Sequence, residues 1–285
     1  MLVVVVFGLA AAVLYGSADF LGGAASRRAR ALSVLTVSAP AGAIIILAAA
    51  LAVGAPVRVA GLGWAVAGGA AGGGGLIVFY AGLAAGPMSV VAPVSALVST
   101  VLPVSVALAS GERPGPAVYL GALICLTAIV LVSLDGGAPT RPASQPGAAR
   151  GIGCGVASGV AFGLFFLFLR NAGASGVLWP VAAARITGMV IVIGAAVWMG
   201  APPAWRGASR RILLAAIASG VLDAGANACY ILATRAGLLG MAVVLTSLYP
   251  GATVLLARVL LGERMRSVQR VGLCLAAVGI VLVTA

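Results

Sequence analysis

Gly262-Glu263-Arg264 and the apolar run from Val271 to Thr284 repeat a pattern found 151 residues earlier, which begins at Gly111-Glu112-Arg113. At the same offset, Ile129 to Ser133 aligns with Ile280 to Thr284. Apolar matches are common in a hydrophobic chain, but a repeated Gly-Glu-Arg triplet is not. Because self-similarity at a fixed offset indicates an internal repeat, the sequence predicts two halves of similar build.

The composition is that of a membrane protein. Of the 285 residues, 62% are hydrophobic and 8% are charged, whereas about 25% are charged in an average soluble chain. The basic residues are 17 arginines and no lysine, and the net charge is +12. These arginines lie singly or in short groups between apolar runs, whereas a nucleic-acid-binding protein gathers them on one face. We therefore expect the lipid bilayer as a partner and no nucleic acid.

Residues that bind metals or act as nucleophiles are few. The chain has no histidine, and its four cysteines lie singly within apolar segments, where free cysteine usually serves as a small packing residue. The sequence has no phosphate-binding loop of the Walker type. A membrane enzyme acting on lipids would need a cluster of acids, histidines or paired cysteines at one membrane face. We therefore predict no catalytic residue, no metal and no cofactor, and a protein that is not an enzyme.

Apolar stretches predict ten membrane-spanning helices, because a bilayer core of about 30 Å requires about 20 apolar residues. The break from Asp135 to Arg150 contains three prolines and cannot be helical throughout. We predict one five-helix repeat over residues 1–134, a linker over 135–150 and a second repeat over 151–285. The approximate spans are 2–24, 32–53, 62–84, 90–110, 117–134, 151–169, 178–199, 212–234, 240–261 and 268–285.

An odd number of spans per half makes the second half enter the membrane from the opposite side. The predicted fold is therefore an all-α membrane protein of two inverted five-helix repeats around a central cavity near the bilayer midplane. Loops after the odd-numbered spans carry eleven arginines, and loops after the even-numbered spans carry four. By the positive-inside rule, this asymmetry places the odd loops in the cytoplasm and both termini outside.

Charged residues within the predicted spans are candidates for function, because a charge in hydrocarbon is costly. Asp223 lies in the middle of the eighth span, and Asn227 and Tyr230 follow at i+4 and i+7 on the same helical face. This polar stripe lines a solute or proton path, or else forms a buried structural network. Arg185 in the seventh span could extend its side chain to the interface, but we expect it to pair with an acid. The sequence leaves Asp223 and Asp19 as alternative partners.

Asp19 in the first span shares a helical face with Tyr15. An interfacial salt bridge at the helix end explains Asp19 as well as a functional role does. Because hydrocarbon favours a neutral carboxyl, Asp223 is the first candidate for proton coupling and Asp19 is the second. Tyr15, Tyr80 and Tyr249 are further candidates for the cavity lining, although core packing would explain Tyr80 and Tyr249 equally well.

The two Gly-Glu-Arg triplets are expected to be structural. In each, the glutamate precedes the next helix by a few residues, so Glu112 and Glu263 can favour the positive N-terminal end of that helix. The adjacent Arg113 and Arg264 are then their expected ion-pair partners.

Three motifs occur in order along the chain. They are Tyr-Gly-Ser-Ala-Asp-Phe at 15–20, Gly-Pro-Met-Ser-Val-Val-Ala-Pro at 86–93 and Ala-Val-Val-Leu-Thr-Ser-Leu-Tyr-Pro at 242–250. The second and third each lead to one of the Gly-Glu-Arg triplets. Over nearly its whole length the chain thereby resembles EamA-type transporters of the drug/metabolite transporter superfamily.

The resemblance implies inverted repeats, a central cavity formed by the first four helices of each repeat, and export or exchange of metabolites or drugs, often coupled to protons. It also implies that the fifth and tenth helices are peripheral. Ten-span members are usually drawn with both termini in the cytoplasm, which is the reverse of what the arginine count favours.

The sequence thus predicts a secondary-active transporter of the inner membrane that exports or exchanges a small polar metabolite, such as an amino acid, by alternating access. A proton is one candidate coupling ion, and Arg185 leans toward an anionic or zwitterionic substrate. The alternatives are a multidrug/proton antiporter, a passive channel and a membrane scaffold that transports nothing. We expect a monomer or a homodimer.

Overall fold

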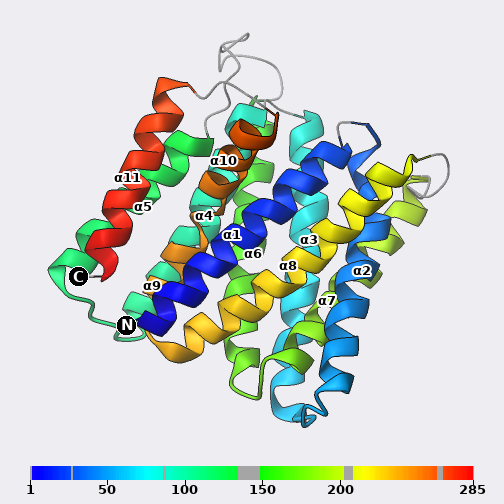
Figure 1. The fold of residues 1–285 in the computed structure, drawn as a ribbon, viewed down its shortest axis with the longest axis horizontal. Helices are drawn as coiled ribbons and strands as arrows, with labels where there is room; N and C mark the ends of the chain where they lie inside the picture. The colour runs from blue at the N-terminus through cyan, green and yellow to red at the C-terminus, as the bar shows by residue number, and fades with distance from the viewer. Residues whose placement is uncertain are drawn as a thin grey trace.

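The computed structural model describes residues 2–26, 28–85, 88–133, 148–201, 208–261 and 266–284. Within these ranges every regular element is a helix (Figure 1). The first half contains α1 (Leu2–Ser26), α2 (Ala31–Ala52), the short 3-10 helix η1 (Val59–Gly61), α3 (Leu62–Ala85), α4 (Met88–Ala109) and α5 (Pro116–Ser133). The second half contains α6 (Ala148–Gly173), α7 (Leu178–Trp198), α8 (Arg210–Ala236), α9 (Leu239–Thr246), α10 (Tyr249–Leu261) and α11 (Ser267–Thr284).

These helices confirm the prediction of an all-α membrane protein. Among the described residues, eight helical stretches are long and apolar enough to cross a membrane, and α5 and α11 are apolar but slightly shorter. Each of the ten predicted spans falls on helix, and no end differs by more than four residues. Hydropathy predicts these positions well because a chain in lipid must satisfy its backbone hydrogen bonds within each helix.

The predicted ninth span, 240–261, is confirmed as one apolar helical stretch, but a turn interrupts the helix within it. α9 ends at Thr246 and α10 begins at Tyr249, with a turn between them. Pro250 accounts for the break, since it has no N–H to donate to the Thr246 carbonyl and its ring clashes with the preceding turn. Prolines inside α2 and α4 leave those helices intact, so the presence of a proline alone did not predict the break.

The helices of the two halves interleave. α1 packs against α8 and α10, α3 packs against α6 and α7, and α2 lies against both α7 and α8. α5 and α11 pair with each other at one edge of the bundle (Figure 1). The interior of the bundle is therefore built from helices that are far apart in the sequence.

Glycines permit the closest helix crossings. A Cβ at Gly220 of α8 would collide with the carbonyl oxygen of Ser38 in α2, and a Cβ at Gly69 of α3 would collide with the carbonyl oxygen of Ala184 in α7. Small residues at such crossings let helix backbones touch, which is a principal source of packing energy in membranes.

Gly220→Ala should destabilise the protein by about 1–3 kcal/mol, because the added methyl group forces α2 and α8 apart. Gly225→Ala in the same helix is the matched control, since its Cβ would lie 3.6 Å from Leu14 Cδ1, an ordinary contact. The midpoint of thermal unfolding in detergent measures both changes. Equal midpoints for the two variants would contradict the proposed backbone contact.

Candidate functional site

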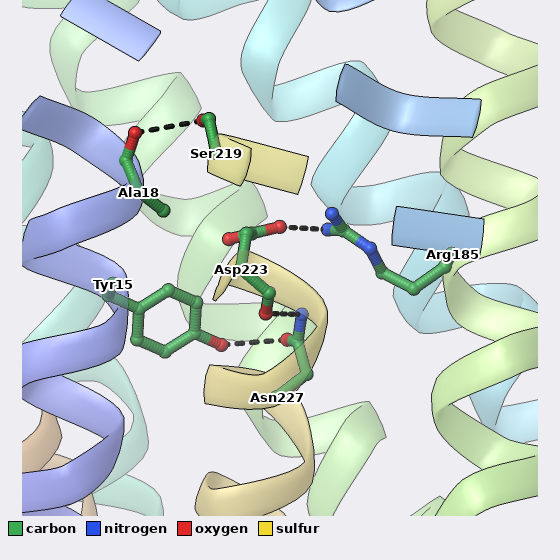
Figure 2. Close-up of polar contacts among 6 residues, drawn as sticks. All are labelled: Tyr15, Ala18, Arg185, Ser219, Asp223 and Asn227. Carbon is green, nitrogen blue, oxygen red and sulfur yellow. Dashed lines mark hydrogen bonds and ion pairs between the residues drawn. The ribbon is translucent and has the colours of Figure 1, made fainter. Parts of the chain in front are cut away.

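Arg185 of α7 and Asp223 of α8 form an ion pair inside the bundle (Figure 2). The Arg185 side chain is 19% exposed and the Asp223 side chain is 30% exposed, so both are partly shielded from solvent. Of the two partners that the sequence left open for Arg185, the structure places Asp223 and not Asp19 beside it. Removing one member of the pair would leave a partly shielded charge without its partner.

The guanidinium group of Arg185 passes close to α2 on its way to Asp223. A Cβ at Gly42 of α2 would lie 2.9 Å from Arg185 Nη2 and 2.6 Å from the Gly220 carbonyl oxygen. A larger residue at position 42 would therefore displace the arginine. Sequence reasoning missed Gly42, because among the many small residues of the apolar helices nothing distinguishes it.

A hydrogen-bond network links this pair to α1 (Figure 2). Asn227 Nδ2 donates to the Asp223 carbonyl oxygen at 2.8 Å, and Tyr15 Oη donates to Asn227 Oδ1 at 2.7 Å. A second link lies toward the other end of the crossing, where Ser219 Oγ donates to the Ala18 carbonyl oxygen at 2.8 Å. The predicted stripe on α8 therefore faces α1 and α7 and takes part in polar contacts within the bundle.

Tyr230, the third member of the stripe, is completely buried. Its hydroxyl donates to the Phe166 carbonyl oxygen at 2.9 Å, and the two ring centroids are 4.8 Å apart. Tyr15 contacts Phe166 and Tyr249 edge-on, with ring centroids 6.1 and 6.2 Å away. These four aromatic residues form a cluster beside the polar network. In this conformation Tyr230 contacts protein on all sides and lines no open space.

Asp19 is exposed, yet it lies on the inner side of α1. It follows Tyr15 by one helical turn and is turned away from the exposed valines of the same helix. It is close enough to Asp223, to Tyr80 of α3 and to Tyr249 of α10 to interact with them electrostatically.

The alternative explanation for Asp19, an interfacial salt bridge, finds no support in the described residues. No arginine among them, Arg28 included, forms a salt bridge with Asp19. Arg27, the other arginine considered, lies outside the described residues.

Glu112 is structural, but the predicted partners were wrong. Its carboxylate accepts hydrogen bonds from the first two backbone N–H groups of α9, at 2.8 and 3.1 Å, and does not cap the adjacent α5. Its ion-pair partner is Arg170 of α6, at 4.0 Å, and not Arg113. The carboxylate thus stabilises a helix N-terminus in the other half of the chain. Glu263 and Arg264 lie outside the described residues.

The site offers a cation, two carboxylates, an amide and phenolic hydroxyls, contributed by α1, α3, α7, α8 and α10. These groups can recognise a polar solute and exchange protons. Within the described ranges, no cluster of three His, Cys, Asp or Glu side chains could hold a metal ion.

Tyr15→Phe should destabilise the protein by about 1–3 kcal/mol, because it leaves the buried Asn227 Oδ1 without a donor. Tyr119→Phe is the matched control, since Tyr119 of α5 is 42% exposed and loses no buried partner. The shift in thermal unfolding midpoint should be clear for the first variant and close to zero for the second. No shift for Tyr15→Phe would argue against the hydrogen bond.

Comparisons with known proteins agree with this picture. Residues 149–285 match the model of a family described as the EamA-like transporter family. One solved structure, described only as the crystal structure of a protein, has a TM-score of 0.82 and 19% sequence identity, covering 99% of this chain and 98% of that chain. At that identity the likeness concerns the fold alone. No curated protein sequence is similar enough to count as a match. The second half of the chain is therefore similar to the EamA-like transporter family, and the eight apolar helical stretches among the described residues indicate a multi-pass membrane protein.

Proposed function

We propose that this protein is a secondary-active transporter that exports or exchanges a small polar metabolite by alternating access across the inner membrane. The observation that carries the proposal is the Arg185–Asp223 ion pair inside the bundle, beside the accessible carboxylate of Asp19. Charged groups are expensive at membrane depth, and those that occur there usually mark a solute or ion path.

Helix packing supports two inverted repeats over residues 1–134 and 151–285, joined by the segment 135–150. We match α1 to α5, in order, with α6, α7, α8, the pair α9–α10 and α11. Under this matching, each main contact between two helices corresponds to another main contact between their counterparts. The pairing of α3 with α6 then corresponds to that of α8 with α1, and the pairing of α3 with α7 corresponds to that of α8 with α2. Such exchange is expected for repeats related by a twofold axis in the membrane plane.

Two glycine contacts between helices support the same matching of the two halves. Gly69 and Gly220 are 151 residues apart, which is the offset of the Gly-Glu-Arg triplets. Each allows its helix to approach a backbone carbonyl of the partner helix, at Ala184 and Ser38 respectively. A shared offset in sequence and a shared contact in space support the same repeat.

The proposed substrate is a zwitterion of amino-acid size. A substrate carboxylate would bind the Arg185 guanidinium, since arginine and carboxylate form strong charge-assisted hydrogen bonds. A substrate ammonium group would then be placed near Asp223 and Asp19. Because Asp19 has no ion-pair partner among the described residues, a second candidate is a multidrug/proton antiporter, in which the acids alone could hold a cationic drug.

If protons drive transport, the geometry favours Asp19 as their carrier. Protonating Asp223 would break its ion pair with Arg185, whereas Asp19 has no arginine partner among the described residues to lose. Asp223, the first candidate on sequence grounds, would instead hold Arg185 in position and contact the substrate.

A thermal-shift screen of amino acids and related polar metabolites should identify a ligand, and liposomes should then show saturable counterflow of that ligand. Asp19→Asn is expected to retain counterflow but lose proton movement coupled to it, measured with a pH-sensitive dye inside the liposomes. Asp223→Asn should weaken ligand binding itself.

Full proton coupling in Asp19→Asn would remove Asp19 from the mechanism. A wild-type protein without saturable counterflow for any ligand would refute the carrier.

Arg185→Gln should weaken binding of an anionic or zwitterionic ligand by about tenfold or more, because a charge-assisted hydrogen bond is worth about 1.4 kcal/mol or more. Binding of a neutral ligand should change much less. Arg258→Gln, at an exposed position of α10, controls for the loss of one positive charge. Because Arg185→Gln leaves Asp223 without its ion-pair partner, size-exclusion chromatography checks that the variant is folded. Equal losses for charged and neutral ligands would argue against direct contact.

A further inference from the structure

A second polar site lies at one end of the bundle. There the loop after α2, the turn between α6 and α7 and the C-terminal end of α8 enclose a pocket of about 290 Å³. The pocket includes Leu178, seven residues before Arg185 on α7, and Arg235, twelve residues after Asp223 on α8. At 1.5 Å per residue, it lies about 10 Å along α7 and about 18 Å along α8 from the ion pair. It is therefore separate from the candidate transport site.

Positive charge converges on this pocket from two chain segments. Arg58 precedes η1, and Arg235 lies in the last turn of α8. Both side chains are exposed, and in the described part of the chain neither forms a salt bridge. Arg235 also complements the negative end of the α8 dipole, but no such helix end accounts for Arg58.

The N-terminus of α7 adds hydrogen-bond donors to the same pocket. Its N-cap residue, Val177, provides no side-chain acceptor, and the N–H groups of Leu178 and Trp179, in the first turn, have no partner within the helix. Pro180, the third residue, has no N–H to offer. Val177, Leu178 and Trp179 all line the pocket. A helix N-terminus with free N–H groups favours an anion, and here it lies beside two arginines.

The pocket walls are joined to each other. Trp179 Nε1 donates to the Ala55 carbonyl oxygen at 2.8 Å, which ties the start of α7 to the loop that carries Arg58. Ser175 Oγ donates to the Ala172 carbonyl oxygen at 2.8 Å and holds the turn between α6 and α7. Because tryptophan is typical of the membrane–water interface, the pocket is expected at the depth of lipid phosphates.

We propose that this pocket binds the phosphate of an anionic phospholipid headgroup or of a soluble phosphate ester. Two guanidinium groups and the α7 N-terminus match the charge and the acceptor geometry of phosphate, which arginine binds through paired hydrogen bonds. The volume is close to the lower limit of small-molecule pockets, about 300 Å³, and suits a headgroup-sized anion. The site requires neither Arg185 nor Asp223, so the proposal stands apart from the transport function.

The test is native mass spectrometry of the purified full-length protein with phosphatidylglycerol, and thermal shift in detergent with inorganic phosphate. Wild type should bind at least one of these probes. Arg58→Gln/Arg235→Gln should weaken that binding by at least about tenfold, as expected from the loss of two charge-assisted contacts. Arg58→Lys/Arg235→Lys, which keeps both charges, should retain most of it. Arg113→Gln, an exposed arginine outside the pocket, should bind like wild type.

The two probes separate the sources of the phosphate. Binding of phosphatidylglycerol alone assigns a lipid headgroup, and binding of inorganic phosphate assigns a soluble phosphate group. Size-exclusion chromatography checks that each variant is folded, and the lysine variant supplies the comparison if the glutamine variant is not. The proposal is overturned if wild type binds neither probe, if Arg113→Gln loses as much as the double variant, or if the glutamine variant binds as tightly as wild type.

Discussion

The cost of holding a charge inside a membrane protein governs the arrangement around Arg185 and Asp223. Desolvating two ions costs several kcal/mol each, and their attraction compensates only when geometry is good and the remaining donors and acceptors are satisfied. The neighbouring structure provides part of this. Gly42 leaves room for the guanidinium group, and Asn227 engages the backbone of Asp223 while accepting from Tyr15. The buried Nε of Arg185, however, has no hydrogen-bond partner among the described residues, so the pair is not fully compensated. A group left without a partner in a polar site is available to a ligand.

The scaffold is close to symmetric, whereas the charges are not. If Gly220 corresponds to Gly69 and Ser38 to Ala184, then Asp223 corresponds to Gly72 and Arg185 to Ala39. Both members of the ion pair therefore belong to the second half, and small residues occupy the equivalent positions in the first. In the proposed transporter, the repeat would supply the two related conformations, and the second half would supply most of the polar recognition. Asp19 on α1 is the principal contribution of the first half.

The sequence predicted what depends on local pattern and missed what depends on proximity in space. Span positions follow from hydropathy, and the polar stripe of Asp223 follows from helical periodicity. The partner of Arg185 could not be chosen, because pairing is set by how α7 and α8 lie relative to α1. The same limit explains the error at Glu112: proximity along the chain suggested α5, but the carboxylate reaches α9, 127 residues away. Gly42 and Phe166 act through contacts between distant helices, and no local signal distinguishes them.

Solvent exposure changes along the polar residues at the crossing of α1 and α8, and this change bears on alternating access. α1 and α8 run antiparallel, since Ala18 meets Ser219 and Tyr15 meets Asn227. Asp19 is exposed and Asp223 is partly exposed, whereas Asn227 and Tyr230 are 1% and 0% exposed. Exposure is therefore greater toward Asp19, whereas beyond Asn227 the aromatic cluster of Tyr15, Phe166, Tyr230 and Tyr249 fills the space between the helices. To open the other end, the proposed cycle must separate these rings and break the Tyr230–Phe166 hydrogen bond. Since Phe166 lies on α6 and Tyr15 on α1, the equivalent first helices of the two halves, the closing contact lies where relative movement of the halves would act on it directly.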